Sequence, residues 1–240
     1  MNLAIDIGNS RVKVALFKQG QLVAKTILES FSPAQVEKFW SDYGNPERAI
    51  VSNVGEETKL PVRWNFPSLI LDSQTALPFQ SEYKTPQTIG KDRLALAAAA
   101  RFQYPAQDCL VIDAGTCITY DFVNRSGNYL GGGISPGLKM RLQSLPHFTS
   151  RLPLVEAKPH FELIGQSTEN SILSGTVGGI IREVEGTIAE YKSRYPQLVS
   201  IVTGGDMLWF DDLLKNSIFA APDFLMMGLN YILDYNAERL

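Results

Sequence analysis

A pattern near the amino terminus recurs at one constant offset in the middle of the chain, and this repeat restricts the possible folds more than any other feature. The copies begin at Leu3 (LAIDIGNS) and at Leu110 (LVIDAGTC). Each copy is an apolar strand, an Asp, a Gly-containing turn and a second strand. Coincidence is the competing interpretation, because apolar strands before polar turns are common, but the aligned identities favour duplication. A single long offset indicates two related domains and not a solenoid, which needs three or more short units.

Strands and helices alternate in two cycles, which is the pattern of an α/β protein. The first cycle is expected to hold strands at Leu3–Ile7, Arg11–Lys18, Leu22–Ile27 and Arg48–Ser52, and helices from Pro33 to near Gly44 and over Leu94–Phe102. The second is expected to hold strands at Cys109–Ala114, Thr119–Val123, Tyr129–Gly132 and Val199–Thr203, and helices over Thr168–Arg194 and Phe224–Leu233. We therefore predict an amino-terminal domain over residues 1–108 and a carboxyl-terminal domain over residues 109–240.

The composition is that of an ordinary globular protein, with 45% hydrophobic and 20% charged residues. The net charge of −3 provides no basic footprint for a nucleic-acid backbone. The longest purely apolar run, Leu94–Ala100, is far shorter than the ~18 residues that cross a bilayer. No signal peptide is expected at the amino terminus, so Cys109 and Cys117 are expected to stay reduced. These features predict a cytoplasmic protein that binds neither nucleic acid nor membranes.

The turn of each repeat copy carries an Asp and a Gly, at Asp6 and Gly8 in the first copy and at Asp113 and Gly115 in the second. A Gly turn lets the backbone approach phosphate oxygens and present N–H donors to them. A neighbouring carboxylate can hold Mg²⁺ directly or through water. A plain β-turn is the alternative for either hairpin alone, but the pair favours a site that clamps nucleotide phosphates.

A third candidate segment is Val202–Asp206, which follows a short apolar strand and precedes a predicted helix. Its two glycines, Gly204 and Gly205, would let an adenine or a ribose lie flat on the backbone. The alternative is a strand-to-helix turn with Asp206 as the N-cap, and taken alone this alternative is the more common arrangement.

Seven short motifs follow one another along the chain. They are DIGNSRVK at Asp6–Lys13, YKTP at Tyr83–Pro86, GKDR at Gly90–Arg93, DAGT at Asp113–Thr116, GGGISPG at Gly131–Gly137, IGQST at Ile164–Thr168 and TGG at Thr203–Gly205. Each is unspecific by itself, but together they cover nearly the whole chain, which resembles the type III pantothenate kinase family. Lys91 departs from the family pattern, where Ala is usual, and this departure touches the substrate segment.

The resemblance implies an α/β fold of two ribonuclease-H-like domains, as in the actin-like, acetate-and-sugar-kinase superfamily, with ATP in the cleft between the domains. It implies phosphorylation of pantothenate to 4′-phosphopantothenate, the first step of coenzyme A biosynthesis. ATP would be the co-substrate, Mg²⁺ and a monovalent cation, K⁺ or NH₄⁺, would be the cofactors, and the protein would be a homodimer.

The resemblance also implies a role for each motif residue. ATP would be bound by Asp6, Ile7, Gly8, Asn9, Ser10, Arg11, Val12, Lys13, Thr116, Gly204 and Gly205. Pantothenate would be held by Tyr83, Gly90, Lys91, Asp92, Arg93 and Thr168. Asp92 would be the catalytic base, Asp113 would bind the monovalent cation, and Asp6 would bind Mg²⁺ directly or through water.

Elementary chemistry supports part of this assignment and leaves alternatives open. Asp92 falls at the start of the Ala-rich helix, where the helix dipole keeps a carboxylate ionised, and phosphoryl transfer uses an acid that accepts the proton of the attacking hydroxyl. Asp92 could instead merely cap that helix. Arg93 could pair with a substrate carboxylate or with the transferred phosphate, or it could be a solvated arginine.

Two other functions compete with the pantothenate kinase interpretation. One is a kinase for another small hydroxylated acceptor such as a sugar, which Tyr83, the GKDR motif and Thr168 disfavour. The other is a non-catalytic transcriptional accessory protein of the same fold. Asp92 together with both Asp-Gly hairpins disfavours the accessory protein, because a pure binding protein needs no base.

Overall fold

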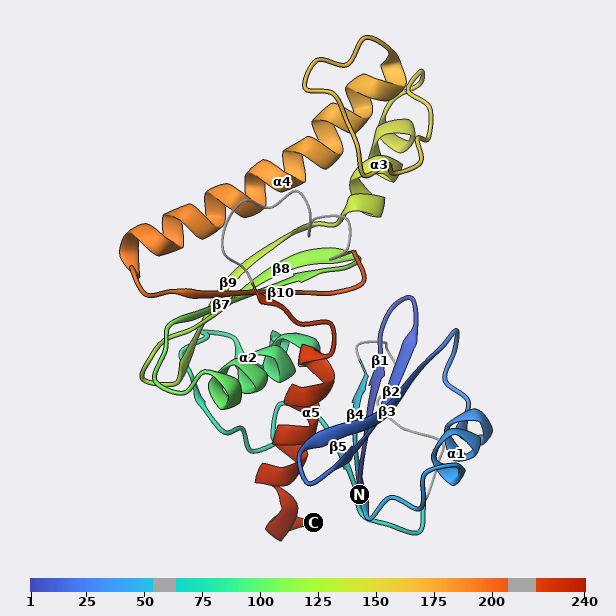
Figure 1. Ribbon diagram of the computed structural model, residues 1–240, viewed down its shortest axis with the longest axis vertical. Coiled ribbons are helices and arrows are strands. Elements are labelled where there is room, and N and C mark those ends of the chain that lie inside the picture. Colours follow the sequence, from blue (N-terminus) through green and yellow to red (C-terminus); the bar gives the residue numbers. More distant parts are fainter. Residues whose placement is uncertain (54–63, 207–218) are drawn as a thin grey trace. The chain divides into compact units, whose positions relative to one another are not determined.

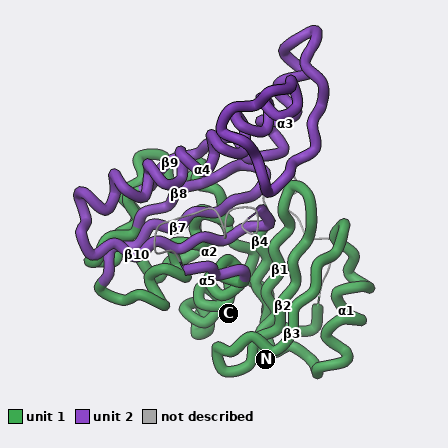
Figure 2. Tube along the Cα trace, turned by 45° about the horizontal axis from the view of Figure 1, so that its top comes forward, with its two compact units in different colours: residues 1–106, 123–130, 223–240 green, residues 107–122, 131–222 purple. Residues whose placement is uncertain are grey.

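The computed structural model describes residues 1–53, 64–206 and 219–240. The chain forms two compact units (Figure 2). Unit 1 comprises residues 1–106, 123–130 and 223–240, and unit 2 comprises residues 107–122 and 131–222. The last residues of the chain therefore cluster with its amino-terminal part. The division into domains at residues 108 and 109 stays a prediction.

Unit 1 is built on a five-stranded sheet (Figure 1). Its strands are β1 (Asn2–Ile7), β2 (Val12–Lys18), β3 (Gln21–Leu28), β4 (Arg48–Asn53) and β5 (Ser68–Ile70), in the spatial order β3-β2-β1-β4-β5. Strand β1 runs antiparallel to β2 and parallel to β4. The remaining elements are α1 (Pro33–Ser41), β6 (Gln80–Ser81), α2 (Lys91–Gln103), α5 (Phe224–Tyr235) and two 3₁₀ turns, Pro86–Thr88 and Ala237–Arg239.

Helices cover both faces of the unit 1 sheet, because its strands are apolar on both sides. Val36 and Trp40 of α1 pack into a core with alternate strand residues on one face; these are Leu3, Ile5, Val12, Val14, Leu16, Ala49 and Val51. Asn2 points to the opposite face, where its Nδ2 donates to Asn230 Oδ1 of α5 at 2.7 Å. Helix α5 also packs against α2, which is buried along its whole Ala-rich middle.

Unit 2 repeats the strand order of unit 1. Its strands are β7 (Cys109–Ala114), β8 (Cys117–Val123), β9 (Asn128–Pro136), β10 (Val199–Thr203) and β11 (Phe219–Ala220), in the spatial order β11-β10-β7-β8-β9. In both units, the third, second, first, fourth and fifth strands therefore follow one another across the sheet. The first residues of β9 cluster with unit 1, where they pair with β6. The shared strand order confirms that the sequence repeat marks one topology used twice.

The unit 2 sheet has a long helix on one face (Figure 1). This helix is α4 (Thr168–Arg194), and the shorter helix α3 (Leu138–Phe148) follows β9. Ser167 caps α4, since its Oγ accepts a hydrogen bond from Asn170 N at 3.1 Å. Apolar residues at helical spacing pack α4 onto the sheet; among them are Ile172, Leu173, Val177, Ile180, Ile181, Val184 and Ile188.

The predicted strands and helices are confirmed, with ends displaced by at most a few residues. Helix α3 is not among the predicted elements, and the helix predicted after Asp206 lies outside the described residues. Within the described ranges, no helix combines the length and the apolar character needed to cross a membrane. Cys109 and Cys117 are both free thiols.

Candidate functional site

Asp6 lies near the carboxyl end of β1, with its carboxylate inside unit 1. The residue is 5% exposed and accepts a hydrogen bond from Ser52 Oγ at 3.0 Å. Ser52 is its neighbour because β1 and β4 run parallel, with these two residues paired in register. On the other side, the antiparallel pairing of β1 with β2 places Lys13 opposite Asp6. The Asp6 carboxylate therefore lies on a strand flanked by β4, which carries the Ser52 hydroxyl, and by β2, which carries the Lys13 ammonium group.

Burial raises the pKa of the Asp6 carboxyl to about 6, because an ionised carboxylate loses hydration in the core. The charge of Lys13 and the hydrogen bond from Ser52 oppose this rise, whereas the negative charge of Asp92 adds to it. Asp92 therefore lies within electrostatic range of Asp6. We name the group formed by Asp6, Ser52, Lys91, Asp92 and Arg93 the β1–α2 site.

The first turn of α2 carries three of the predicted substrate residues, and a fourth, Gly90, is its N-cap. Asp92 is the second helical residue, and its Oδ1 accepts a hydrogen bond from Arg93 N at 2.8 Å. The N-cap residue is therefore Gly90, and Asp92 is a first-turn carboxylate that accepts one of the free backbone N–H groups at the start of the helix. Lys91 Nζ donates to Asn53 O at 2.8 Å and ties the start of α2 to the end of β4.

Arg93 is 4% exposed, so the alternative of a solvated arginine is wrong. Its guanidinium carbon lies 5.8 Å from the centre of the Tyr83 ring, which is a cation–π distance. The Tyr83 ring stacks on Tyr129, with ring centres 6.2 Å apart and planes inclined by 19°. The structure thus brings two predicted substrate residues, Tyr83 and Arg93, together, and Arg93 directly follows Asp92 in the first turn of α2.

The predicted phosphate segment Asp6–Lys13 is the hairpin between β1 and β2. Gly8 N donates to Arg11 O at 3.1 Å, which closes the turn. Between these residues, Asn9 and Ser10 are exposed, and Arg11 is exposed as well. The turn therefore presents polar groups and one cation to the solvent beside the buried carboxylate, an arrangement that suits an anionic ligand.

Asp113 occupies the corresponding place in unit 2, at the carboxyl end of β7, and it pairs in register with Thr203 of the parallel strand β10. Gly204 follows with a φ of 102°, a left-handed conformation that favours glycine. A Cβ atom there would lie 2.2 Å from Ala114 O and 2.4 Å from Asp113 Oδ1. The backbone at residue 204 therefore lies against Asp113 in a way that only glycine permits. Gly205 is exposed beside it.

Gly115 and Thr116 form the hairpin turn after β7, and Gly115 N donates to Cys117 O at 2.9 Å. Gly137, which precedes α3, supports this turn from behind, because its N donates to Thr116 O at 3.1 Å. A Cβ atom on residue 137 would lie 2.1 Å from Gly115 O, so the contact joins backbone to backbone. We name the group formed by Asp113, Gly115, Thr116, Gly204 and Gly205 the β7–β10 site.

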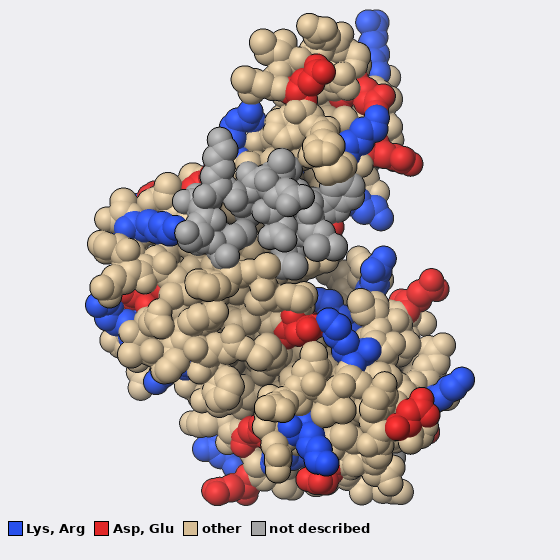
Figure 3. Space-filling model, in the orientation of Figure 1, with Lys and Arg blue, Asp and Glu red and all other residues tan. Residues whose placement is uncertain are grey.

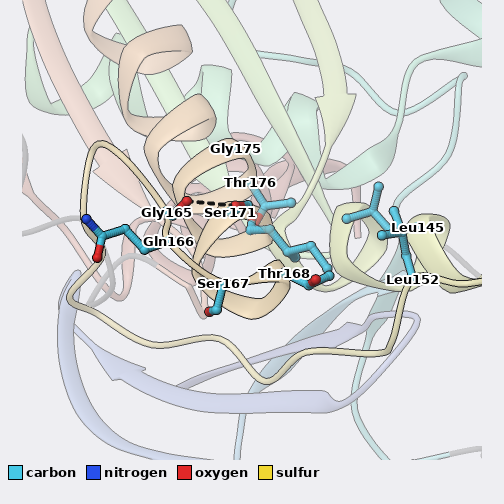
Figure 4. Close-up of a pocket in the computed structure, with 10 residues that line it drawn as sticks. Leu145, Leu152, Gly165, Gln166, Ser167, Thr168, Ser171, Gly175 and Thr176 are labelled. Atoms are coloured by element: carbon cyan, nitrogen blue, oxygen red, sulfur yellow. Dashed lines mark hydrogen bonds between the residues drawn. The ribbon is translucent and has the colours of Figure 1, made fainter.

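Thr168 is the first residue of α4 and is not one of the residues of the β7–β10 site. It lines a pocket of about 840 Å³ that also includes Leu145, Leu152 and Gln166. Figure 4 shows Leu145 and Leu152 together on one side of this pocket and Gln166 on the other, with Ser171 Oγ donating to Gly165 O at 3.1 Å. Thr168 is therefore an exposed hydroxyl at the rim of an apolar wall.

Two residues that neighbour these sites are not identified by the sequence patterns. Ser52 is a buried polar residue at the end of an apolar strand, and its role depends on the parallel pairing of β4 with β1, which no local pattern specifies. Gly137 belongs to a quoted motif, yet only the folded chain places it against Thr116. The signal for Ser52 is a polar residue inside the run AIVSN, where the pattern predicts a fully buried strand.

The carboxylates of the β1–α2 site fit a divalent cation that arrives with a ligand. Within the described ranges, no group of three or more His, Cys, Asp or Glu side chains could hold a metal ion by itself. Asp92 is near enough to Asp6 for its charge to raise the pKa of the Asp6 carboxyl. One or two carboxylates, completed by substrate phosphates and waters, are the ligands that Mg²⁺ prefers. The donor set therefore fits Mg²⁺ bound together with a nucleotide.

Comparison with protein families gives one match across most of the chain. Residues 2–190 match the family model described as type III pantothenate kinase. A type III pantothenate kinase of Christiangramia forsetii is 47% identical over 243 residues, and the alignment covers 100% of both chains.

Comparison with solved structures shows the fold. A Campylobacter jejuni protein assigned to the Baf family of transcriptional activators is similar with a TM-score of 0.66 at 21% identity, over 98% of this chain and 99% of that chain. A ROK hexokinase of Thermus thermophilus is similar with a TM-score of 0.52 at 12% identity, over 96% and 97%. At these identities the likenesses concern architecture alone, and they support the predicted α/β fold with its two sheets.

Proposed function

Since the chain belongs to the type III pantothenate kinase family, we propose that Asp92 is the base that activates the pantothenate hydroxyl. The reaction is the ATP-dependent phosphorylation of pantothenate to 4′-phosphopantothenate, the first step of coenzyme A biosynthesis. The observation that supports this role of Asp92 is its place in the first turn of α2, next to the buried Arg93 and within electrostatic range of the buried Asp6.

Phosphoryl transfer to an alcohol requires that the alcohol lose its proton and that the charge on the phosphoryl oxygens be stabilised. Oδ1 of Asp92 accepts the Arg93 N–H, so Oδ2 is the proposed acceptor of the hydroxyl proton. Tyr83, Gly90, Lys91, Arg93 and Thr168 are the proposed contacts of pantothenate. Arg93 would meet either the pantothenate carboxylate or the transferred phosphoryl group, because a guanidinium recognises both.

ATP is the co-substrate, and its proposed contacts are the hairpin Asp6–Lys13 together with Thr116, Gly204 and Gly205. Asp6 is the proposed holder of Mg²⁺, directly or through water. Bound Mg²⁺ would supply positive charge next to the phosphate oxygens. Asp113 is the proposed contact of the monovalent cation, K⁺ or NH₄⁺, because its carboxylate lies against the backbone of Gly204.

We also propose that the protein is a cytoplasmic homodimer that binds no nucleic acid. The support for the dimer is a set of exposed large apolar side chains on unit 2, which we call the apolar patch: Phe148, Leu154, Leu163 and Ile164, at 80%, 63%, 73% and 75% exposed. Each of these residues lies within three positions of a residue that lines the Thr168 pocket. The support against nucleic acid is the net charge of −3, with basic and acidic side chains interspersed on the face drawn in Figure 3.

The experiment that tests the role of Asp92 measures ADP release by the wild type and by Asp92→Asn, with ATP, Mg²⁺ and pantothenate, with and without K⁺. Asparagine keeps the size of the side chain and removes the proton acceptor, so we expect kcat to fall about 10²- to 10⁴-fold. Nucleotide affinity, measured by direct titration, should change little. Asp42→Asn, which alters an exposed carboxylate at the end of α1, is the matched control.

Each alternative outcome has a distinct meaning. Turnover of Asp92→Asn at the wild-type rate would exclude Asp92 as the base. Wild-type activity with a sugar but not with pantothenate would replace the acceptor and keep the fold. A folded wild type that binds ATP but turns over no acceptor would favour the accessory-protein alternative.

A further inference from the structure

A charged network in unit 2 lies directly behind the turn that we assign to the nucleotide phosphates. We propose that Arg141 and Glu183 are positioning residues that fix the Gly115–Thr116 turn and thereby determine nucleotide affinity. This inference rests on the proposed function only in assigning phosphates to that turn. Neither residue belongs to a motif of the sequence analysis.

Arg141 lies on α3, and its guanidinium forms hydrogen bonds with the end of β9. Its Nε donates to Pro136 O at 2.8 Å, and an Nη2 hydrogen bond to Ser135 Oγ has a length of 2.9 Å. The backbone N of Arg141 donates to Gly137 O at 3.0 Å. One side chain and its own backbone therefore hold three consecutive residues, at the point where the strand ends and the helix begins.

Glu183 on α4 holds the guanidinium in this position. Its Oε2 pairs with Arg141 Nη2, and its Oε1 accepts a hydrogen bond from Tyr120 Oη at 2.9 Å. Partial burial raises the pKa of the Glu183 carboxyl, but hydrogen bonds from Arg141, Tyr120 and Ser135 outweigh this effect, and its pKa lies below the ordinary value. Glu183 is therefore an ionised partner on the long helix that anchors the network.

The connection from this network to the turn passes through Gly137. Gly137 N donates to Thr116 O at 3.1 Å, and the absence of a side chain lets its Cα approach within backbone contact of Gly115. Since Arg141 fixes Ser135 and Pro136, it fixes the donor that holds Thr116. A bidentate guanidinium clamp restricts orientation as well as distance, which is what a phosphate-binding turn requires.

The test compares Arg141→Met with the wild type by direct titration of Mg²⁺ and the β,γ-imido analogue of ATP, and by steady-state kinetics. We expect about a tenfold loss of nucleotide affinity and a similar rise in KM for ATP, because hydrogen bonds of a charged group are lost. The KM for pantothenate should stay within about twofold, since the network does not touch the β1–α2 site residues. Arg194→Met removes the exposed Arg194–Glu190 pair from α4, the helix that carries Glu183, and is the matched control.

Conservative variants separate positioning from folding. Arg141→Lys keeps the charge but not the paired N–H donors of the guanidinium, and it should lose less nucleotide affinity than Arg141→Met. Glu183→Gln and Tyr120→Phe should each weaken nucleotide binding by about threefold with little change in the thermal midpoint, and they decide the matter should Arg141→Met fail to fold.

Nucleotide affinity equal to that of the wild type in Glu183→Gln, Tyr120→Phe and folded Arg141→Met would overturn the inference. So would equal losses for ATP and pantothenate, which would indicate general damage. A wild type that binds the nucleotide analogue but does not phosphorylate pantothenate would overturn the proposed function, and the titrations would still decide this inference. A wild type that binds no nucleotide would overturn both.

Discussion

Among single residues, Asp6 shows most clearly how a functional group can oppose stability. A carboxylate that is 5% exposed is favourable only with partners, and Ser52 and Lys13 together do not offset its loss of hydration. The folded chain therefore binds a proton on Asp6 more tightly than the unfolded chain does. When Asp6 is ionised, its buried negative charge is poorly compensated, and a cation brought by a nucleotide would neutralise it.

The pKa of Asp6 predicts a pH-dependent gain in stability for Asp6→Asn. The pKa is about 6 in the folded chain against 3.8 for the unperturbed group, so ionisation destabilises the fold progressively as the pH rises from about 4 to about 6. Above pH 6 the penalty is complete, at about 3 kcal/mol. We expect Asp6→Asn to raise the free energy of unfolding by up to about that amount at pH 7 and to leave it nearly unchanged at pH 4.

Urea unfolding at the two pH values, followed by circular dichroism, checks this prediction. Asp42→Asn is the control for a carboxylate in solvent and should have little effect at either pH. An equal gain at pH 4 and pH 7 would show that the effect arises from packing and not from charge. The variant should be inactive, because Asp6 is the proposed holder of Mg²⁺.

At the scale of elements, the position of α2 relative to the sheet of unit 1 governs the β1–α2 site. Asp92 and Arg93 are in the first turn of α2, whereas Asp6 is on β1, so their relation depends on how the helix begins. Lys91 provides a polar link at that point, from its Nζ to Asn53 O at the end of β4. Alanine at this position could not make the link, although alanine is usual in the family that the sequence resembles.

Lys91→Met should therefore impair catalysis more than nucleotide binding. Methionine keeps much of the length and loses the charged donor, whose hydrogen bond is worth about 1.5–3 kcal/mol in comparable settings. We expect kcat to fall about tenfold or the KM for pantothenate to rise by a similar factor, with nucleotide affinity preserved. Steady-state kinetics in both substrates measures this, and Lys91→Arg, which keeps a donor, should restore most of the activity. Wild-type kinetics in Lys91→Met would contradict the proposed role of the link.

The elements also differ in how far the sequence predicts them. Strand and helix periodicity is local, so β7, β10 and α4 agree with their predicted bounds. Helix α3 escapes because it follows a glycine-rich strand and contains Pro146, which ordinarily signals a helix end. Ser52 and Arg141 escape because their roles arise from partners distant in the sequence, on β1 and on α4. A pattern along the chain predicts which elements form, and only the folded chain shows which side chains they bring together.

At the scale of the whole molecule, the repeat leads to the same strand order in two units, and each unit brings an Asp to the carboxyl end of its first strand. Parallel strands that end at one edge gather the residues that follow them. This explains why Asp6 lies beside Ser52 and why Asp113 lies beside Gly204. The duplicated topology thus accounts for two carboxylate sites without any similarity in the segments that connect the strands.

The apolar patch predicts the state of assembly. Four large apolar side chains are mostly exposed, and their hydration is unfavourable in a monomer. Covering them in an interface would contribute about 25 cal/mol for each Å² of apolar surface removed from water. We expect sedimentation velocity at about 10 µM to give a dimer, which requires a dissociation constant below that concentration. The double variant Leu163→Glu and Ile164→Glu should sediment as a monomer, because burying two carboxylates in an apolar contact is unfavourable.

Ile27→Glu is the matched control, since Ile27 is 58% exposed on β3 of unit 1, away from the patch in sequence and in unit, and this variant should stay dimeric. The patch residues Leu163 and Ile164 directly precede Gly165, which lines the pocket of Thr168. Loss of the dimer should therefore raise the KM for pantothenate while nucleotide affinity stays the same.

A monomeric wild type would contradict the prediction outright. A dimer that survives both glutamates would place the contact on another surface, and an unchanged KM in a monomeric variant would separate assembly from the substrate pocket.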